Sequence, residues 1–351
     1  MVKKIVIIGG GIAGMESAAY LNAMGYDVSI IEKESKLGGH LLNWERLFPT
    51  KRLGSEVLSF LNKGISKNVH QFMNTDVAGI IRKNKQFDIT LSNGKKLEAD
   101  SVIIATGYDL FNASKKEEYG YGIYNNVITS AELEKMLLNG GRLKISTGNT
   151  PKRVGFIHCV GSRDEKVGNL YCSKVCCVTA VKQSTELKER YPDIEIFCFY
   201  MDMRMYGRGF EELYKESQEK YGVQFIRGRL SEACENKDGT ILVKVEDTLI
   251  GRPLKMSVDL LVLMVGFVPS EGTQKIAGML DLEFDNDGFI KAADEHTMTN
   301  VSNVPGVFLA GTCTGPRTIT NTLTDARAAA AKVASFLEGY DIEERLSKII
   351  S

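Results

Sequence analysis

The sequence lacks any hydrophobic run long enough to cross a membrane, and the long apolar stretch Leu260 to Val268 has only the length of a strand. A spanning helix needs about 20 apolar residues, so we expect no direct membrane insertion. An excess of charge of one sign is also missing, because Lys+Arg and Asp+Glu both number 44. Without a dense basic patch, nucleic acid is not expected as a partner.

Proline is scarce, with 7 residues against 34 glycines, which favours an α/β fold rich in tight turns over a disordered chain. The seven cysteines are an odd number and clustered, and no C-x-x-C pair occurs among them. This excludes the usual dithiol of disulfide reductases and argues against a secreted disulfide framework. The apolar N-terminal run leads directly into glycines, which indicates a buried strand instead of a signal peptide. We expect a cytoplasmic protein.

A nucleotide-binding pattern opens the chain. An apolar strand, residues 5–8, leads into G-x-G-x-x-G at Gly9, Gly11 and Gly14, a helix is expected over residues 15–24, and a second strand, residues 28–31, ends at Glu32. The glycines permit the turn, the approach of a pyrophosphate and close helix packing, while the acid accepts hydrogen bonds from a ribose. The helix N-terminus offers N–H groups to the phosphate.

Three further segments resemble the FAD site of two-dinucleotide-binding flavoproteins. They are a glycine turn after the acid, a strand ending in Ala-Thr-Gly, and VPGVFLAG near the C-terminus, where Thr312 stands in place of the aspartate of many relatives. The predicted FAD-binding residues are therefore Gly9, Gly11, Ile12, Ala13, Gly14, Glu32, Lys33, Gly39, His40, Ala105, Thr106, Gly107, Gly311 and Thr312. We also predict that Arg317 lies near the isoalloxazine and stabilises the reduced, anionic flavin.

A loose internal repeat predicts two related α/β units, each with a basic-apolar strand, a helix, a second strand, a β-ribbon and a buried strand ending in glycine. The expected fold class is α/β, a thioredoxin-reductase-like flavoprotein with two dinucleotide-binding domains, the second a Rossmann-like insertion. We expect residues 1–145 and 252–345 to form the discontinuous FAD-binding domain, and residues 146–251 the inserted domain.

The second unit carries HCVGSRD where a second glycine loop is expected, so only one of the three glycines remains and a nicotinamide dinucleotide lacks its usual cradle. Four cysteines gather here instead: Cys159, Cys172, Cys176 and Cys177. If residues 173–188 are helical, Cys172 and Cys176 share one face near the helix N-terminus. Nearby cations would offset the charge of bound thiolates, namely Arg163, Lys174 and Lys182, and Gly161 would permit close approach.

The spacing alone leaves several readings open. Four thiolates suit an iron–sulfur cluster or zinc. The vicinal or C-x-x-x-C pair also suits a redox disulfide, and any single cysteine can be a small apolar core residue, which is the interpretation for Cys198 and Cys234.

The segments CVGSRD and YCSKVCC, preceded by EYGYGIYNNVITSAELEKML, resemble the flavin-binding A subunit of heterodisulfide reductase and its shorter relatives over nearly the whole chain. This resemblance implies that Cys159, Cys172, Cys176 and Cys177 hold a 4Fe-4S cluster near FAD. It also implies electron transfer to partner subunits resembling heterodisulfide reductase B and C, with a homodimer left open.

The chain begins at the dinucleotide strand and ends soon after the flavin helix, so we expect it to lack the extra cluster modules of the long methanogen-type protein. It looks more like the short subunits of sulfur-oxidising heterodisulfide-reductase-like complexes, or of quinone-interacting oxidoreductases. The alternatives are a self-contained flavin thiol-disulfide reductase and a non-catalytic flavin scaffold with a structural zinc.

Overall fold

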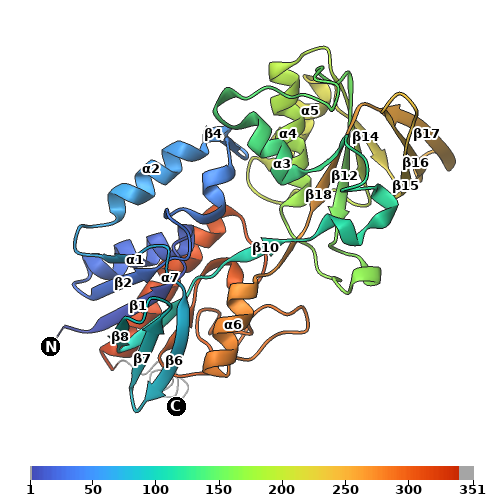
Figure 1. Ribbon diagram of the computed structural model, residues 1–351. Coiled ribbons are helices and arrows are strands. Elements are labelled where there is room, and N and C mark those ends of the chain that lie inside the picture. The colour runs from blue at the N-terminus through green and yellow to red at the C-terminus, as the bar shows by residue number, and fades with distance from the viewer. Residues whose placement is uncertain (1, 340–351) are drawn as a thin grey trace, which may run out of the picture. The chain divides into compact units, whose positions relative to one another are not determined.

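The computed structural model describes residues 2–339 and divides into two compact units. Within the described residues, unit 1 combines residues 2–42, 56–109 and 268–339, and unit 2 combines residues 43–55 and 110–267 (Figure 1). The chain changes unit four times, twice around the segment 43–55 and once each within the short strands β10 (Tyr108–Leu110) and β19 (Phe267–Pro269). No helix in this described part is long and apolar enough to cross a membrane.

Unit 1 is built on a five-stranded parallel sheet. Its strands run in the order β20 (Val307–Leu309), β9 (Ser101–Ile104), β1 (Lys4–Ile8), β2 (Asp27–Ile31), β5 (His70–Phe72). The long helix α7 (Ile319–Leu337) packs beside α1 (Ile12–Ala23) through its small residues Ala326, Ala329 and Ala330, which are fully buried (Figure 1). An antiparallel ribbon also belongs to the unit and consists of β6 (Val77–Lys83), β7 (Gln86–Leu91) and β8 (Lys96–Ala99). Two more helices are α2 (Gly54–Gly64, beginning at the unit boundary) and α6 (Glu271–Leu280), and two short turns are η1 (Gly39–Asn43, ending at a unit boundary) and η6 (Gly311–Thr314).

Unit 2 repeats this plan. Its parallel sheet runs in the order β11 (Val127–Thr129), β18 (Leu260–Val265), β12 (Arg153–Val160), β13 (Glu195–Tyr200), β14 (Gln224–Arg227). Every residue of β18 is buried, as expected for a strand covered on both faces. The remaining elements are α3 (Ser130–Leu137), α4 (Cys176–Arg190), α5 (Phe210–Glu219), the ribbon β15 (Leu230–Glu235), β16 (Ile241–Asp247) and β17 (Arg252–Val258), the hairpin β3 (Arg46–Leu47) and β4 (Arg52–Leu53), and the turns η2 (Ala113–Lys115), η3 (Glu117–Tyr119), η4 (Leu138–Gly140) and η5 (Glu165–Val167).

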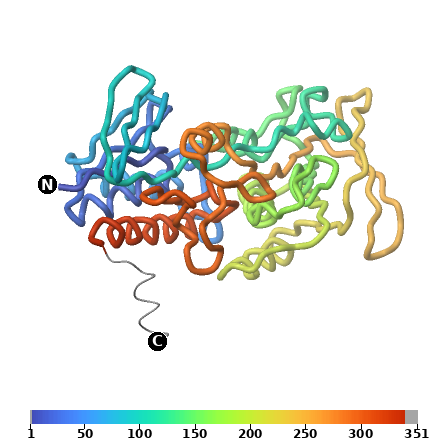
Figure 2. Tube along the Cα trace, turned by 90° about the horizontal axis from the view of Figure 1, so that it is seen from below, coloured from blue at the N-terminus to red at the C-terminus, as the bar shows by residue number. Residues whose placement is uncertain are grey.

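The sheet orders make the internal repeat plain, because β9-β1-β2-β5 in unit 1 corresponds to β18-β12-β13-β14 in unit 2. Each unit also carries a three-stranded ribbon, coloured teal in unit 1 and gold in unit 2 (Figure 2). Only the fifth strand differs, since β20 comes last in its unit whereas β11 comes before the rest of its sheet.

The compact units differ in extent from the expected domains, because unit 2 begins at residue 110 rather than 146 and ends at 267 rather than 251. The reason is that β11 and β18 both belong to its sheet. Unit 2 also takes in the separate segment 43–55. Residues 340–345 of the expected first domain lie outside the described part of the chain.

Candidate functional site

The glycine loop of unit 1 has the backbone geometry that the sequence predicts. Gly9 has φ +109°, and a Cβ there would lie 2.3 Å from the Ala105 carbonyl oxygen. A Cβ on Gly14 would lie 1.9 Å from the Gly9 oxygen, so only glycine fits at either position. Gly11 is different, because a Cβ there would meet nothing within 4 Å. The open space beside Gly11 is therefore available to a ligand.

Helix α1 starts within this glycine motif, at Ile12 instead of the expected residue 15. Gly11 is the N-cap residue and provides no side-chain hydrogen bond to the first turn. The N-cap residue therefore leaves the first N–H groups of α1 without a side-chain acceptor, and these groups lie next to the open space. This arrangement favours a bound phosphate.

Glu32 lies at the end of β2 and is buried, with 7% of its surface exposed. Its carboxylate accepts a hydrogen bond from Gly10 N at 2.6 Å through Oε2 and one from Glu34 N at 2.8 Å through Oε1. Each carboxylate oxygen has further lone pairs for a ligand hydroxyl. The acid therefore anchors the glycine loop as well as offering acceptors, a second role that the sequence did not indicate.

The second glycine turn packs against the first. Gly38 N donates to Gly10 O at 2.8 Å, and a Cβ on Gly39 would lie 3.1 Å from the Gly11 Cα. His40 stacks on Tyr108, with 4.2 Å between ring centroids, and its Nε2 lies 2.9 Å from the Tyr108 carbonyl oxygen. The two turns together border the open space at Gly11.

The C-terminal part of unit 1 meets the same loop. Gly311 has φ +78° and approaches Ala13 so closely that a Cβ would lie 2.8 Å from that methyl group. Its N–H donates to Asp325 Oδ2 at 2.6 Å. Arg317 Nη1 donates to the Gly311 carbonyl at 2.6 Å and to Thr314 Oγ1 at 2.7 Å. Arg317 therefore holds the η6 turn in shape.

Most predicted FAD residues thus gather around the carboxyl end of β1. Beyond those already placed, Thr312 Oγ1 would lie 3.8 Å from a Cβ on Gly107, and Thr106 Oγ1 lies 2.6 Å from Thr273 Oγ1. Ile12 is half-buried at the start of α1, and Lys33 is exposed to solvent.

The four clustered cysteines of unit 2 come from three places in the chain. Cys159 lies near the end of β12, Cys172 lies in the following loop, and Cys176 and Cys177 form the first turn of α4. Cys159, Cys176 and Cys177 are buried, whereas Cys172 is half-buried. Cys172 Sγ accepts a hydrogen bond from Lys174 N at 3.3 Å, and Cys177 Sγ donates to Asp202 O at 3.7 Å.

Burial is the main influence on the acidity of the three buried thiols. Burial raises the pKa of Cys159 to about 12, and the charges of Cys177 and Cys172 act in the same direction. Burial likewise raises the pKa of Cys176, followed by the charges of Cys159, Cys177 and Cys172. The pKa of Cys177 is also raised by burial. Such thiols are neutral and weakly nucleophilic near pH 7 unless a cation binds them.

Several buried polar atoms on residues close in sequence to these cysteines have no hydrogen-bond partner among the described residues. They belong to side chains that precede or follow the cysteines in sequence: His158 (both ring nitrogens), Ser162 (Oγ), Arg163 (Nη1) and Thr179 (Oγ1). Ser162 lies close enough to Cys176, and Arg163 to Cys159, to lower the pKa of that thiol. Buried donors are rarely left unpaired, so Ser162 and Arg163 fit a site whose sulfur-containing ligand would accept their hydrogen bonds.

The helix expected over residues 173–188 is wrong at its start, because α4 begins at Cys176. Lys174 adopts the left-handed conformation, with φ 59°, and Ser173 Oγ accepts from Phe267 N at 2.9 Å. Cys172 therefore does not share a helix face with Cys176. The space beside Gly161 is also not left open, since a Cβ there would lie 2.1 Å from the Phe111 ring.

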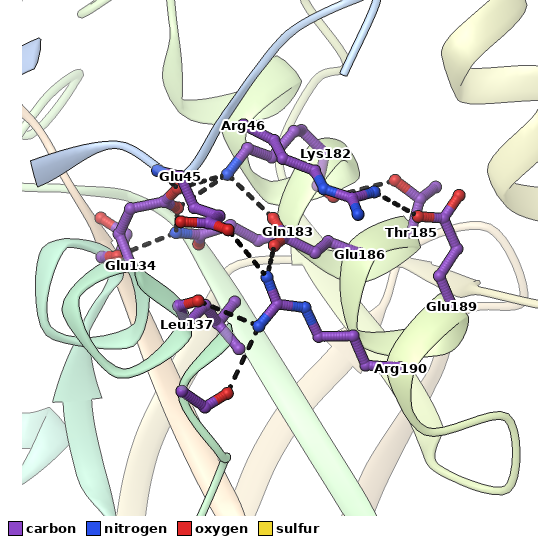
Figure 3. A network of polar contacts seen from close by, with 12 residues as sticks. Glu45, Arg46, Glu134, Leu137, Lys182, Gln183, Thr185, Glu186, Glu189 and Arg190 are labelled. Atoms are coloured by element: carbon purple, nitrogen blue, oxygen red, sulfur yellow. Dashed lines mark hydrogen bonds and ion pairs between the residues drawn. The ribbon is translucent and has the colours of Figure 1, made fainter. Parts of the chain in front are cut away.

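Lys182 does not face the thiols as a free cation but belongs to a buried ion network (Figure 3). Its Nζ donates to Glu134 at 2.6 and 2.8 Å and to Glu186 at 3.2 Å. Arg190 donates to Glu186 at 2.5 Å, and Glu45 N donates to Glu134 Oε1 at 3.0 Å. The network ties α4, which carries two of the cysteines, to α3 and to segment 43–55. Lys182, Glu186 and Arg190 are spaced by four along α4, and this spacing could have predicted part of the network from the sequence.

Within residues 2–339, no group of three or more His, Cys, Asp or Glu side chains is gathered so that it would hold a single metal ion. A zinc ion would need its thiolates about 2.3 Å from one point. Within this part of the chain, the four thiols do not converge in that way.

The two repeated sheets and the glycine loop define a thioredoxin-reductase-like fold with two domains of the dinucleotide-binding type. The thioredoxin reductase of T. acidophilum superposes with a TM-score of 0.64 at 20% identity, covering 97% of this chain and 100% of that one. The thioredoxin reductase of Lactococcus lactis gives 0.66 at 18% identity, covering 96% and 99%. The predicted fold class is confirmed.

The chain belongs to the pyridine nucleotide-disulphide oxidoreductase family, whose sequence profile matches residues 3–138 and 192–332, and is thus an oxidoreductase. The unmatched stretch between these ranges contains all four clustered cysteines. In this stretch the chain departs from the family pattern.

The A subunits of heterodisulfide reductases are similar to this chain, which confirms the expected resemblance. The A subunit of the H2:CoB-CoM heterodisulfide,ferredoxin reductase of Methanothermobacter thermautotrophicus is 46% identical over 244 residues, 68% of this chain and 37% of that protein. The iron-sulfur A subunit of the CoB–CoM heterodisulfide reductase of Methanocaldococcus jannaschii is 34% identical over 421 aligned positions, 95% of this chain and 64% of that protein. The chain thus spans less than two thirds of either relative.

Proposed function

We propose that this protein is the FAD- and 4Fe-4S-containing electron-transfer subunit of a heterodisulfide-reductase-like complex. When bound, the flavin exchanges electrons in pairs or singly and the cluster exchanges them one at a time. The chain's own residues would position the two groups and set their surroundings.

For FAD, the proposal rests on the open space at Gly11 and the acceptors of Glu32. The uncapped N-terminus of α1 would bind the pyrophosphate, and Glu32 would accept from the ribose. Gly39, Gly107 and Thr312 would border the remainder of the cofactor. Arg317 is proposed to add positive charge near the flavin through the η6 turn that it holds.

The proposal of a cluster is supported by four buried or half-buried cysteines and two residues with unpaired buried donors, Ser162 and Arg163, which all occur in the stretch unmatched by the family profile. Cys159, Cys172, Cys176 and Cys177 would be the ligands. Ser162 and Arg163 would donate hydrogen bonds to sulfur. The similarity to a relative named an iron-sulfur protein supports iron as the metal.

Two alternatives receive less support. A self-contained thiol-disulfide reductase would use Cys172, Cys176 or Cys177 as a reactive thiolate, but burial raises the pKa of Cys176 and Cys177. A scaffold with structural zinc needs four thiolates around one point, and no such convergence is found within the described residues.

The similar proteins are named as parts of heterodisulfide reductases, which supports a function within a complex of several different chains. We propose partners that resemble the B and C subunits, a role in sulfur or disulfide metabolism, and a cytoplasmic location. A second copy of this chain is a further candidate partner.

The test is anaerobic purification followed by assays of flavin, iron, labile sulfide and zinc in wild type and in Cys176→Ala. We expect flavin with about four irons and four sulfides per chain, and loss of iron but not flavin in the variant. The control is Cys234→Ala, because Cys234 is an exposed cysteine outside the proposed ligand set. Its exposure also shows that the interpretation of Cys234 as a core residue was wrong. Wild-type protein with flavin and no iron, or with zinc, contradicts the proposal.

A further inference from the structure

Arg163 is fixed at both ends beside the cysteine group. Its backbone adopts the left-handed conformation, with φ 52°, and its N–H donates to Tyr171 O at 2.9 Å. At the other end, Nη2 donates to Asp202 Oδ2 at 2.6 Å. Asp202 follows β13, and Arg163 follows β12, so the pair joins the carboxyl ends of two neighbouring strands.

The guanidinium acts on the thiols as well as on Asp202. Its Nη1 is buried and has no hydrogen-bond partner among the described residues. Burial raises the pKa of Cys159, and the charge of Arg163 partly offsets this rise. Burial alone would lower the pKa of Arg163, but its hydrogen bond to Asp202 and the charges of Cys159 and Cys172 raise it. Cys177 Sγ donates to the backbone oxygen of the same Asp202 at 3.7 Å, so the guanidinium and one of the four thiols bind the same residue.

Asp202 neutralises this positive charge only in part. Its side chain is 48% exposed, so water screens it, and Arg227 lies within 3.7 Å of its other oxygen. Asp202 also stands where a dinucleotide-binding domain would present an acid to a ribose. In this chain the acid holds an arginine instead, which agrees with the missing glycine cradle.

We propose that Arg163, held in place by Asp202, raises the reduction potential of the group bound by the four thiols. This inference rests on the proposed function. A cluster gains one negative charge on reduction, so a nearby cation and a hydrogen bond to sulfur stabilise the reduced form. Arg163 supplies both.

The test compares three variants by iron content and by an EPR-monitored redox titration of the cluster. Arg163→Gln removes the positive charge. Asp202→Asn keeps an acceptor for Nη2 but removes the negative charge. Arg153→Gln is the matched control, because Arg153 pairs with Glu195 at 2.7 Å across the opposite ends of the same two strands.

We expect Arg163→Gln to lower the potential by about 59 mV, equal to a roughly tenfold change in the ratio of reduced to oxidised cluster. Asp202→Asn should raise the potential, and Arg153→Gln should leave it unchanged. Opposite signs separate a charge effect from a structural one. If Arg163→Gln holds no iron, a raised potential in Asp202→Asn supports the inference.

An unchanged potential in iron-replete Arg163→Gln, or no rise in Asp202→Asn, overturns the role of Arg163 while leaving the cluster assignment intact. Wild-type protein without iron is a different result, because it removes the proposed function and this inference together.

Discussion

Glu32 accepts a hydrogen bond from Gly10 N at 2.6 Å, so the acid at the end of β2 holds the loop that follows β1. Glu32→Ala removes both this anchor and the proposed ribose acceptor. Hydrogen bonds to charged groups contribute about 1.5–3 kcal/mol, so we expect FAD to bind roughly 10- to 150-fold more weakly. Fluorescence titration of the apoprotein with FAD measures this. Glu34→Ala, with an exposed side chain, is the control, and equal affinities for all three proteins would refute the role of Glu32.

A substitution at Gly11 should affect ligand binding but not folding, because a Cβ there meets no protein atom within 4 Å. We expect Gly11→Ala to change the free energy of unfolding by less than about 0.5 kcal/mol. It should nevertheless lower FAD affinity at least roughly tenfold, since the methyl group would occupy the space of the pyrophosphate. Gly278→Ala in α6 also meets open space and should bind FAD normally. Normal FAD affinity in Gly11→Ala would place the pyrophosphate elsewhere.

The sequence was sufficient for the features that depend on local chemistry. The loop from Gly9 to Gly14 and the acid Glu32 follow one another at fixed spacing, and each needs its residue type for a local reason. The sequence was insufficient to predict features that depend on contacts between residues far apart in the chain. Cys172 lies outside α4 because Lys174 adopts a left-handed conformation and Ser173 binds Phe267, which is far away in the chain. No periodicity reveals such a contact.

Contacts between residues far apart in the sequence also determine which residues belong to unit 2. Residues 43–55 belong to it, and Glu45 and Arg46 of this segment interact with residues about 90 and 140 positions later. The role expected of Lys182 was wrong for the same reason, since its partner Glu134 is 48 residues earlier. A charged residue in a sequence does not show which opposite charge it will meet.

Lys182 and Glu134 are both almost fully buried, with 1% and 2% of their side chains exposed. Removing one partner of a buried ion pair costs about 3–5 kcal/mol, because the other charge stays buried without compensation. Lys182→Met should therefore lower the free energy of unfolding by about that amount, measured by urea denaturation monitored by circular dichroism. Lys215→Met breaks only an exposed pair and should cost less than about 0.5 kcal/mol. Equal stabilities would show that the network contributes little.

Asp164 provides a pH-dependent contribution to stability. Burial would raise its pKa, but the hydrogen bond from Lys116 and the charges of Arg229 and Lys116 outweigh burial and lower it. A carboxyl with a lowered pKa stabilises the fold above its unfolded value of about 3.9, and this contribution disappears as pH falls through the folded pKa. Asp164→Asn should therefore melt at a lower temperature than wild type at pH 7.

The difference in melting temperature between Asp164→Asn and wild type should narrow below about pH 4, in the range where the wild-type carboxyl becomes protonated. Asp88→Asn alters a more exposed pair with Lys83 and should melt within about 1–2 °C of wild type at every pH. A difference for Asp164→Asn that stays constant down to pH 3 would contradict the electrostatic explanation.

An anaerobic reductive titration followed by absorbance and EPR shows whether one chain holds both a flavin and a four-iron cluster. A flavin takes up two electrons and a four-iron cluster one, so we expect about three electrons per chain, with an EPR signal from the reduced cluster. Uptake of about two electrons without that signal would match a flavin scaffold, and about four would match a flavin with a redox disulfide. Either of these results would show that the chain does not combine a flavin with a four-iron cluster.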